Sequence, residues 1–394
     1  MKEPIEAWVV VWATFVCLAT IFGVSYSFAA FFESFAAEFS AQRADVSFIF
    51  GLSGFVYFVM GAVGGMLADR FGPRIVCSAG MGLIALGLLG TSFATSLLAI
   101  YVSYGLLAGL GIALVYTPSI ASVQPWFTTR RGLAGGIAST GVGAGTLFVP
   151  MLLAFAIAAM PWREAMQWLA VGVLVIGIAA ASLLKRAPAA RRSASGQEAP
   201  GLTLRETLRT STFRWFYVAT VTASPVMFIP FVHAPAAARD MGIDEASAVG
   251  LVGVIGVGSL VGRFAIGWVA DRIGRAKTLV LMQLSMGCSY FIWAGADGYA
   301  WMFAFALWFG LSYGSIVSLL PAICMDYFGG RSVASIVGTL YSGAALGNLL
   351  GPVLAGAAFD FSGNYAAVIV SCLAIAAVAT WSSHRMDQTA QPKF

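Results

Sequence analysis

Long apolar runs constrain this chain more than any other feature of its sequence. A helix that crosses the hydrocarbon core of a bilayer needs about 20 predominantly apolar residues. Only 10% of the 394 residues are charged, against roughly 25% in a soluble domain. The sequence therefore predicts an all-α membrane protein with twelve transmembrane helices, and it excludes a soluble or disordered chain. The predicted spans are 7–33, 46–68, 75–94, 97–122, 132–159, 165–184, 213–238, 245–269, 277–295, 299–324, 332–358 and 364–383.

The basic residues are distributed unevenly between the two sides of these spans. With the N-terminus placed in the cytoplasm, all of the 22 lysines and arginines lie on cytoplasmic segments except Arg43, Arg163, Arg239 and Arg263. Basic residues concentrate on the cytoplasmic side of membrane proteins. We therefore expect a multi-pass protein of the cell membrane (the inner membrane of a bacterium) with both termini cytoplasmic. The net charge of +5 is then a topology signal and does not indicate nucleic-acid binding.

The two halves of the sequence repeat each other. The run 65–72 recurs as 267–274, displaced by 202 residues, and Gly141 and Gly145 recur at the same displacement as Gly343 and Gly347. This predicts two pseudo-symmetric six-helix halves of the same orientation, 1–184 and 213–394, joined by a cytoplasmic linker over 185–212. Parallel six-helix repeats of this kind occur in transporters that bind substrate near the membrane midplane, at the repeat interface.

The repeated run has the pattern G-x-x-A-D-R-x-G and falls in the short turns after the second and eighth spans. Glycine permits a tight turn, and the carboxylate can meet the positive end of a facing helix or an arginine. The pattern resembles the signature loop of the major facilitator superfamily, and the resemblance covers essentially the entire chain. It implies either a state-dependent latch or a purely structural turn. The residues concerned are Gly65, Asp69, Arg70, Gly72, Gly267, Asp271, Arg272 and Gly274.

A more specific resemblance lies at the fourth and fifth spans. Tyr116-Thr-Pro118 and the run 126–138, which includes Arg130 and Arg131, look like a signature of monocarboxylate transporters. That family has a second signature at its first helix, and here only Glu6-Ala7-Trp8 and Trp12 are similar to it. The resemblance implies a bacterial relative or a neighbouring branch such as the oxalate/formate exchangers.

Arg263 is the basic residue that topology does not explain. It stands eight residues before Asp271, hence about 12 Å inside the eighth span. A cation at that depth is costly and marks a candidate functional site, and its planar fork matches a carboxylate. The alternative is a structural ion pair. The monocarboxylate family places a substrate arginine at the matching position, generally with an acid four residues earlier. Ser259 stands there instead, which leaves the route of proton coupling open.

Several other polar side chains inside the spans are candidates for the site. His233 can relay a proton or bind an anion because imidazole titrates near neutral pH, and Glu33 is a second candidate for proton coupling. Each is also open to a structural interpretation, His233 as a hydrogen-bonded residue at a helix end and Glu33 as an interfacial residue. The remaining candidates are cavity-lining residues or helix–helix hydrogen bonds: Tyr26, Tyr116, Ser119, Tyr341 and Asn348.

These observations together favour secondary active transport of a small organic anion, with a monocarboxylate as the expected substrate. Alternating access with proton symport or anion exchange would compensate the charge of Arg263 and its ligand. Two alternatives are an efflux carrier for a larger amphipathic compound and a non-transporting nutrient sensor. The sequence has no nucleophile constellation, acid pair or metal-ligand spacing, so we expect no enzyme activity, no cofactor and no metal. We expect the protein to function as a monomer.

Overall fold

The computed structural model describes residues 4–127, 131–187, 201–329 and 331–389. Within these ranges the chain is helical, apart from turns, short connections and one isolated bridge between Gly201 and Gly329. The chain divides into two compact units, Met1–Gln197 and Glu198–Phe394. The division falls inside the predicted linker, of which residues 188–200 lie outside the described ranges.

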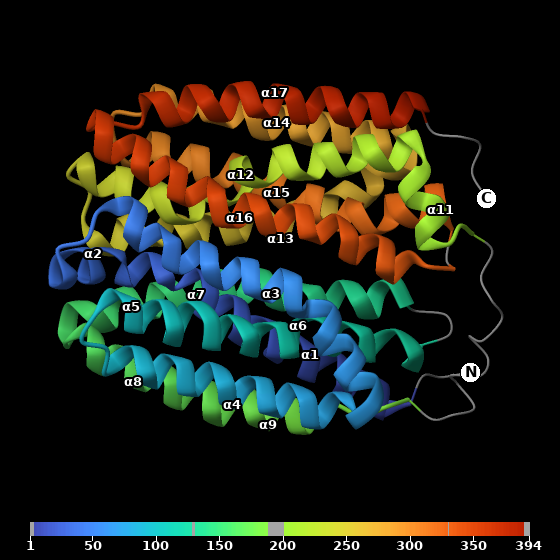
Figure 1. Cartoon of the computed structure of the whole chain (residues 1–394), viewed down its shortest axis with the longest axis horizontal. Coiled ribbons are helices and arrows are strands. Elements are labelled where there is room, and N and C mark those ends of the chain that lie inside the picture. Colours follow the sequence, from blue (N-terminus) through green and yellow to red (C-terminus); the bar gives the residue numbers. More distant parts are fainter. Residues whose placement is uncertain (1–3, 128–130, 188–200, 330, 390–394) are drawn as a thin grey trace. The chain divides into compact units, whose positions relative to one another are not determined.

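The first unit is drawn from blue to green in Figure 1, and its long helices lie roughly parallel. Two of its spans contain π-helical segments, Tyr101–Ala108 and Val173–Gly177, each continuous with the α-helices beside it. The α-helices of the unit are α1 (Ile5–Tyr26), α2 (Phe28–Phe39), α3 (Arg43–Phe71), α4 (Pro73–Ser92), α5 (Leu97–Ile100), α6 (Gly109–Val123), α7 (Arg131–Ala159), α8 (Trp162–Gly172) and α9 (Ile178–Ser182).

The second unit runs from yellow-green to red in Figure 1 and begins with a short helix before its first long one. That short helix starts with a capping box, in which Thr203 and Glu206 bond reciprocally to each other's backbone N–H groups. The helices of the unit are α11 (Leu204–Arg209), α12 (Ser211–Asp240), α13 (Glu245–Ile273), α14 (Arg275–Ala294), α15 (Tyr299–Phe328), α16 (Val333–Ser362) and α17 (Ala366–Thr389).

Equivalent helices pair in the same way inside each unit. Helix α1 packs on α7 as α12 packs on α16, and α3 packs on α6 as α13 packs on α15. Repeated glycines make these contacts possible: a Cβ at Gly145 would overlap the carbonyl oxygen of Ala19, and one at Gly347 would overlap the side chain of Ser224. The sequence repeat is therefore a repeat of close helix contacts, which small residues permit in membranes.

Eleven helical segments in the described part of the chain are long and apolar enough to cross a membrane. The one predicted span that is not among these eleven is the ninth, 277–295, which corresponds to α14; this helix is less apolar and packs against α15 and α17. Two other details differ from the expectation. The first span is interrupted at Ser27, between α1 and α2. The fifth span continues as helix through Pro150 without a break.

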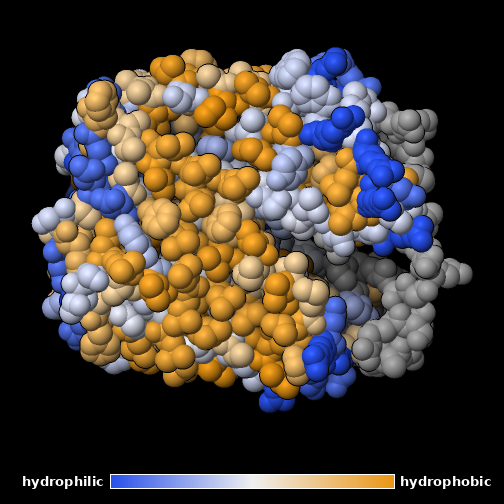
Figure 2. Space-filling view, viewed as in Figure 1, coloured by the Kyte–Doolittle hydropathy of each residue, from blue (hydrophilic) through white to orange (hydrophobic). Residues whose placement is uncertain are grey.

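The surface of each unit has the polarity of a membrane protein. Figure 2 shows apolar side chains over the middle of the helices and hydrophilic residues toward their ends. Leu86 and Val175 in the first unit, and Phe264 and Phe291 in the second, are large apolar side chains with more than half of their surface exposed. A bilayer provides the apolar surroundings that such a surface needs.

Candidate functional site

Arg263 lies in the middle third of α13, where sequence reasoning placed it. Its side chain is part-buried, and its Nε donates to the Ser259 hydroxyl one turn earlier at 3.4 Å. That distance makes a weak hydrogen bond. In the part of the chain that the structure describes, no carboxylate forms an ion pair with Arg263. The arrangement is therefore that of a cation with one weak protein partner and donors to spare.

Glycines hold the helix that carries Arg263 tightly against α15. A Cβ at Gly258 would overlap the carbonyl oxygen of Leu307, and a Cβ at Gly262 would overlap that of Leu311. The Ser315 hydroxyl lies between the two helices, 2.8 Å from the Leu311 oxygen and 3.2 Å from the Gly262 oxygen. The backbone beneath Arg263 is therefore fixed, so the origin of the side chain is well defined.

The first unit gathers aromatic rings around the two predicted tyrosines. Tyr26 stacks on Phe22 at 5.9 Å between ring centroids, and Tyr116 meets Phe22 edge to face at 5.4 Å. Tyr57 of α3 joins the same group, 6.4 Å from Phe22 and 6.5 Å from Tyr116. Sequence reasoning missed Tyr57, although it stands 202 residues before Ser259. We call Phe22, Tyr26, Tyr57 and Tyr116 the aromatic cluster.

Ser119 has a local role in the structure. It is fully buried, and its hydroxyl donates to the Tyr116 carbonyl of its own helix at 3.1 Å. The Ser119 carbonyl in turn accepts the Thr14 hydroxyl of α1 at 3.1 Å. The bond from Thr14 joins α1 to α6 inside the first unit. Ser119 therefore takes part in a helix–helix hydrogen bond, one of the two roles expected for it.

His233 is fully buried between α12 and α16. Its Nε2 lies 2.8 Å from the Pro352 carbonyl oxygen and its Nδ1 lies 3.0 Å from the Tyr365 hydroxyl. A carbonyl only accepts, so Nε2 carries the proton, and in the neutral ring Nδ1 accepts from Tyr365. Tyr365 was not among the predicted residues. No local sequence signal links it to His233, because 132 positions separate the two.

The two remaining predicted binding residues lie on one helix. Asn348 is buried on α16, and Tyr341 is half-buried about two turns earlier on the same helix. Glu33 is half-buried on α2 of the first unit. The structure therefore joins His233 to α16 at Pro352 and to Tyr365 in the connection after that helix, while Glu33 belongs to the other unit.

The two signature turns depend on glycine for their geometry. Gly72 has φ 94° and Gly274 has φ 91°, values that side-chain-bearing residues rarely adopt. Each glycine ends one helix and the next begins at the following residue. The turn function predicted for these glycines thus has a direct structural reason.

A further residue at the first turn was missed by sequence reasoning. Arg186 donates to the carbonyl oxygens of Ala68 (2.9 Å) and Asp69 at the end of α3. A cation at a helix C-terminus is favourable because the free carbonyls there carry partial negative charge. Arg186 had been interpreted as a topology signal only. The Asp69 and Arg70 side chains are exposed.

Part of the signature set falls outside the described residues. Arg130 lies outside them altogether, and the structure does not describe the side chains of Arg131 and Asp271 or the surroundings of Gly267. The latch role predicted for these residues stays a prediction. Arg272 is exposed at the end of α13.

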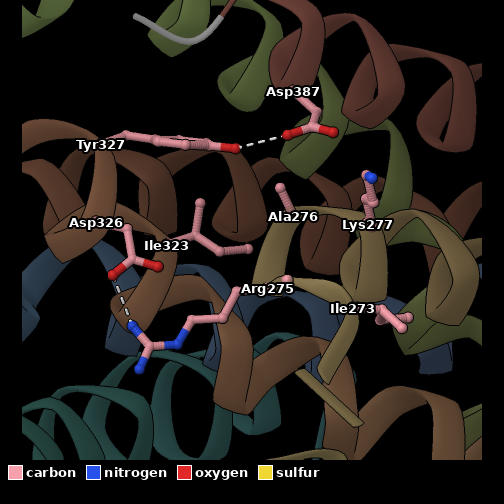
Figure 3. Close-up of a pocket in the computed structure, with 9 residues that line it drawn as sticks. Ile273, Arg275, Ala276, Lys277, Ile323, Asp326, Tyr327 and Asp387 are labelled. Atoms are coloured by element: carbon pink, nitrogen blue, oxygen red, sulfur yellow. Dashed lines mark hydrogen bonds and ion pairs between the residues drawn. The ribbon is translucent and has the colours of Figure 1, made fainter. Parts of the chain in front are cut away.

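A pocket of about 200 Å³ lies beside the second signature turn (Figure 3). The Arg275 guanidinium pairs with Asp326 at 2.7 Å, and the Tyr327 hydroxyl donates to Asp387 at 2.8 Å. The Lys277 side chain points away from Arg275 in this view. Three of the four charged groups around the pocket are therefore engaged with protein partners. The contacts tie the start of α14 to α15, and α15 to α17.

Known proteins resemble this chain over most of its length. The family model of the Major Facilitator Superfamily matches residues 13–352, and again 257–392. Monocarboxylate transporter 13 of Bos taurus is 34% identical over 365 residues, which cover 92% of this chain and 85% of the relative. The chain belongs to the monocarboxylate transporter branch of this superfamily. Monocarboxylate transporter 11 of Mus musculus is 31% identical over 380 residues, with 93% and 84% covered.

A solved structure supports the fold assignment independently of these sequences. A bacterial homologue of the human lysosomal transporter Spinster, in an inward-facing and unoccupied conformation, matches with a TM-score of 0.72. The match covers 99% of both chains at 17% identity. The predicted all-α transporter fold and the resemblance to monocarboxylate transporters are therefore confirmed, and the chain is a multi-pass membrane transporter.

Proposed function

We propose that this transporter moves a small monocarboxylate across the membrane, with Arg263 as the anchor of the carboxylate. The relatives described above are named monocarboxylate transporters, and a third, monocarboxylate transporter 3 of Rattus norvegicus, is 30% identical over 370 residues, 91% of this chain and 75% of that relative. The observation that carries the proposal is the cation at Arg263, which among the described residues has only the weak hydrogen bond to Ser259.

A guanidinium in this position suits a carboxylate ligand. Its planar fork donates two parallel hydrogen bonds to the two oxygens, and its charge persists at all physiological pH values. The bond to Ser259 uses Nε, so the two terminal nitrogens supply the fork. A carboxylate bound there neutralises a charge that would otherwise stay exposed to an apolar environment.

Charge compensation is the second part of the proposal. The substrate leaves Arg263 readily only if its own charge is accompanied by a proton or replaced by another anion. His233 and Glu33 are the candidate proton carriers, and the geometry of His233 sets a condition. Because the Pro352 oxygen only accepts, a proton added at Nδ1 requires the Tyr365 hydroxyl to turn from donor to acceptor.

The proposed orientation in the membrane rests on the distribution of the basic residues. We propose that both termini lie in the cytoplasm of a cell whose bounding membrane holds the protein, and that a monomer is the transporting unit. The positive-inside distribution of the 22 basic residues supports the orientation.

Transport into proteoliposomes tests the proposal. Labelled acetate, lactate, pyruvate and benzoate are offered to the native protein and to Arg263→Gln, with and without a pH gradient. Arg205→Gln, an exposed arginine of α11, is the matched control. We expect uptake of at least one carboxylate by the native protein and the control, and loss of that uptake in Arg263→Gln. Undiminished carboxylate uptake by Arg263→Gln would refute the anchoring role.

A second substitution probes the same cation without removing it. Ser259→Asp places a carboxylate one turn from Arg263 and supplies the ion-pair partner that the described residues lack. We expect it to compete with the substrate and raise KM. An unchanged KM would show that Arg263 does not bind the anion. Counterflow that is independent of pH would assign anion exchange rather than proton symport.

A further inference from the structure

The hydrogen-bond ladder of the first long helix of each unit has a gap at the same place in the repeat, although only the helix of the first unit is interrupted there. In the first unit, α1 ends at Tyr26 and α2 begins at Phe28, with Ser27 between them. In the second unit, α12 contains Pro225, Pro230 and Pro235. A proline has no N–H, so Pro230 leaves the carbonyl oxygen of Val226, four residues earlier, without its helical donor. Val24 and Val226 are displaced by 202 residues, the same displacement as the signature turns.

A buried tyrosine satisfies the carbonyl at each of these two positions. The Tyr104 hydroxyl donates to the Val24 oxygen at 2.8 Å, and the Tyr290 hydroxyl donates to the Val226 oxygen at 2.7 Å. Tyr104 is 1% exposed and Tyr290 is 0% exposed. Val24 lies in the last turn of α1, where helical carbonyls have no intrahelical partner. Both hydroxyls therefore bond to a carbonyl that its own helix does not satisfy.

The two tyrosines do not repeat each other in sequence. Tyr104 belongs to the π-helical segment of the fourth span, whereas Tyr290 belongs to α14, the third long helix of the second unit. Gly109 and Gly310 make equivalent contacts at a displacement of 201, so the repeat equivalent of Tyr104 is Phe305. The equivalent of Tyr290 is Leu88, so neither equivalent has a hydroxyl. The carbonyl position is therefore repeated in both units, while its hydroxyl donor comes from a different helix in each.

We propose that Tyr104 and Tyr290 are positioning residues that set the bend of the first helix in each unit and thereby the rate of the transport cycle. Helix bends arise at prolines and at interruptions of the hydrogen-bond ladder, and hinges absorb the backbone change of a transporter's conformational steps. A hydroxyl on a neighbouring helix fixes where the bend occurs. The part of this inference that concerns rate depends on the proposed transport function, and the part that concerns the two hydrogen bonds does not.

A double-mutant cycle isolates the bond in the second unit. Tyr290→Phe removes the hydroxyl and leaves the Val226 carbonyl buried without a donor. Pro230→Ala restores an N–H that donates to the same oxygen, so it should rescue Tyr290→Phe. Pro235→Ala is the matched control, because it is the same substitution one turn further along and restores a donor to Phe231 rather than to Val226.

Hydrogen exchange reports on the bond without any substrate. We expect Tyr290→Phe to accelerate exchange of the amides in 226–234 by about tenfold, the cost of an unsatisfied buried carbonyl, and Pro230→Ala to reverse most of it. Tyr104→Phe should act in the same way on the amides in 25–30. Unchanged exchange in these segments, or equal rescue by Pro235→Ala, would overturn the assignment of the hydroxyls to these carbonyls.

Transport kinetics test the positioning role. The substrate is whichever of labelled acetate, lactate, pyruvate and benzoate the native protein transports fastest. We expect Tyr290→Phe to lower Vmax about fivefold or more with KM within about twofold, and Pro230→Ala to restore Vmax. An unaltered Vmax, or a KM that rises in step with the loss, would overturn the role in the cycle. If none of the four acids is transported, the transport proposal fails, and hydrogen exchange still decides the structural claim.

Discussion

Arg163 gives a prediction whose size follows from its contacts. It lies at the start of α8 with 32% of its side chain exposed, and it donates to the Ser92 oxygen at 2.7 Å and to the Ala94 oxygen at 2.8 Å. Ser92 is the last residue of α4, and Ala94 lies two residues beyond it. The same guanidinium pairs with Glu38 of α2 and lies 4.5 Å from the centroid of the Trp162 ring. One side chain thus joins three segments of the first unit.

The contacts of Arg163 contribute unequally to the free energy of unfolding, and the order of these contributions makes the prediction specific. A charged donor to a carbonyl is worth about 1.5–3 kcal/mol when well shielded, and partial exposure places these two near the lower end. An exposed ion pair contributes about 0.2–1 kcal/mol, and the ring contact about 0.5–1 kcal/mol. We expect Arg163→Ala to cost about 4 kcal/mol, Arg163→Lys to cost about half of that because the fork is lost, and Glu38→Gln to cost under about 1 kcal/mol.

Thermal unfolding of the purified protein in detergent measures this order. The melting temperature should fall most in Arg163→Ala, less in Arg163→Lys and least in Glu38→Gln. High salt should reduce the effect of Glu38→Gln and leave most of the effect of Arg163→Ala, because only the exposed ion pair is strongly screened. A loss in Glu38→Gln as large as that in Arg163→Ala would show that the ion pair, and not the helix-end carbonyls, holds the three segments together.

Two further predictions concern α13. Gly262→Ala should destabilise the protein by about 1–3 kcal/mol, because the added Cβ would overlap the Leu311 carbonyl. Gly250→Ala on the same helix has open space around its Cβ, so it should be neutral or stabilising in the same melting assay. Hydrogen bonds from the Ser247 side chain and backbone lower the pKa of Asp244 below its ordinary value of 3.8. The stability that Asp244 contributes is therefore present above pH 3.8 and is lost as the pH falls through the lowered pKa. The difference in melting temperature between the native protein and Asp244→Asn should accordingly shrink as the pH falls below about 4. A difference that does not change with pH would contradict this prediction.

The spans were predictable because lipid leaves the backbone little choice. A chain inside a bilayer must satisfy its own N–H and C=O groups, so an apolar run of spanning length becomes a helix. The predicted span 213–238 accordingly matches α12 (Ser211–Asp240) to within two residues. The break at Ser27 was not predictable from a propensity. No proline or glycine stands at that position, and the Ser27 hydroxyl bonds back to the Gly23 carbonyl at 2.5 Å while Tyr104 reaches in from another helix.

The candidate site was predictable only where a residue was unusual for its surroundings. Arg263 stood out because a cation inside a span is rare, and in the structure its Nε lies 3.4 Å from the Ser259 hydroxyl. Tyr365 and Arg186 did not stand out. A tyrosine and an arginine near helix ends are ordinary in a membrane chain, and their roles arise from contacts with residues more than 100 positions away.

The repeat separates residues that build the scaffold from residues that carry the proposed function. Close glycine contacts, and a tyrosine-bonded carbonyl in the first long helix, occur in both units. The arginine does not recur in the first unit, because the repeat equivalent of Arg263 is Gly61. A Cβ added at Gly61 would lie 3.0 Å from the Thr117 Oγ1 atom of α6. The second unit therefore carries the one cation of this kind at the two repeat-equivalent positions. A single cation supports the proposed ligand with a single carboxylate, since a guanidinium binds one carboxylate bidentately.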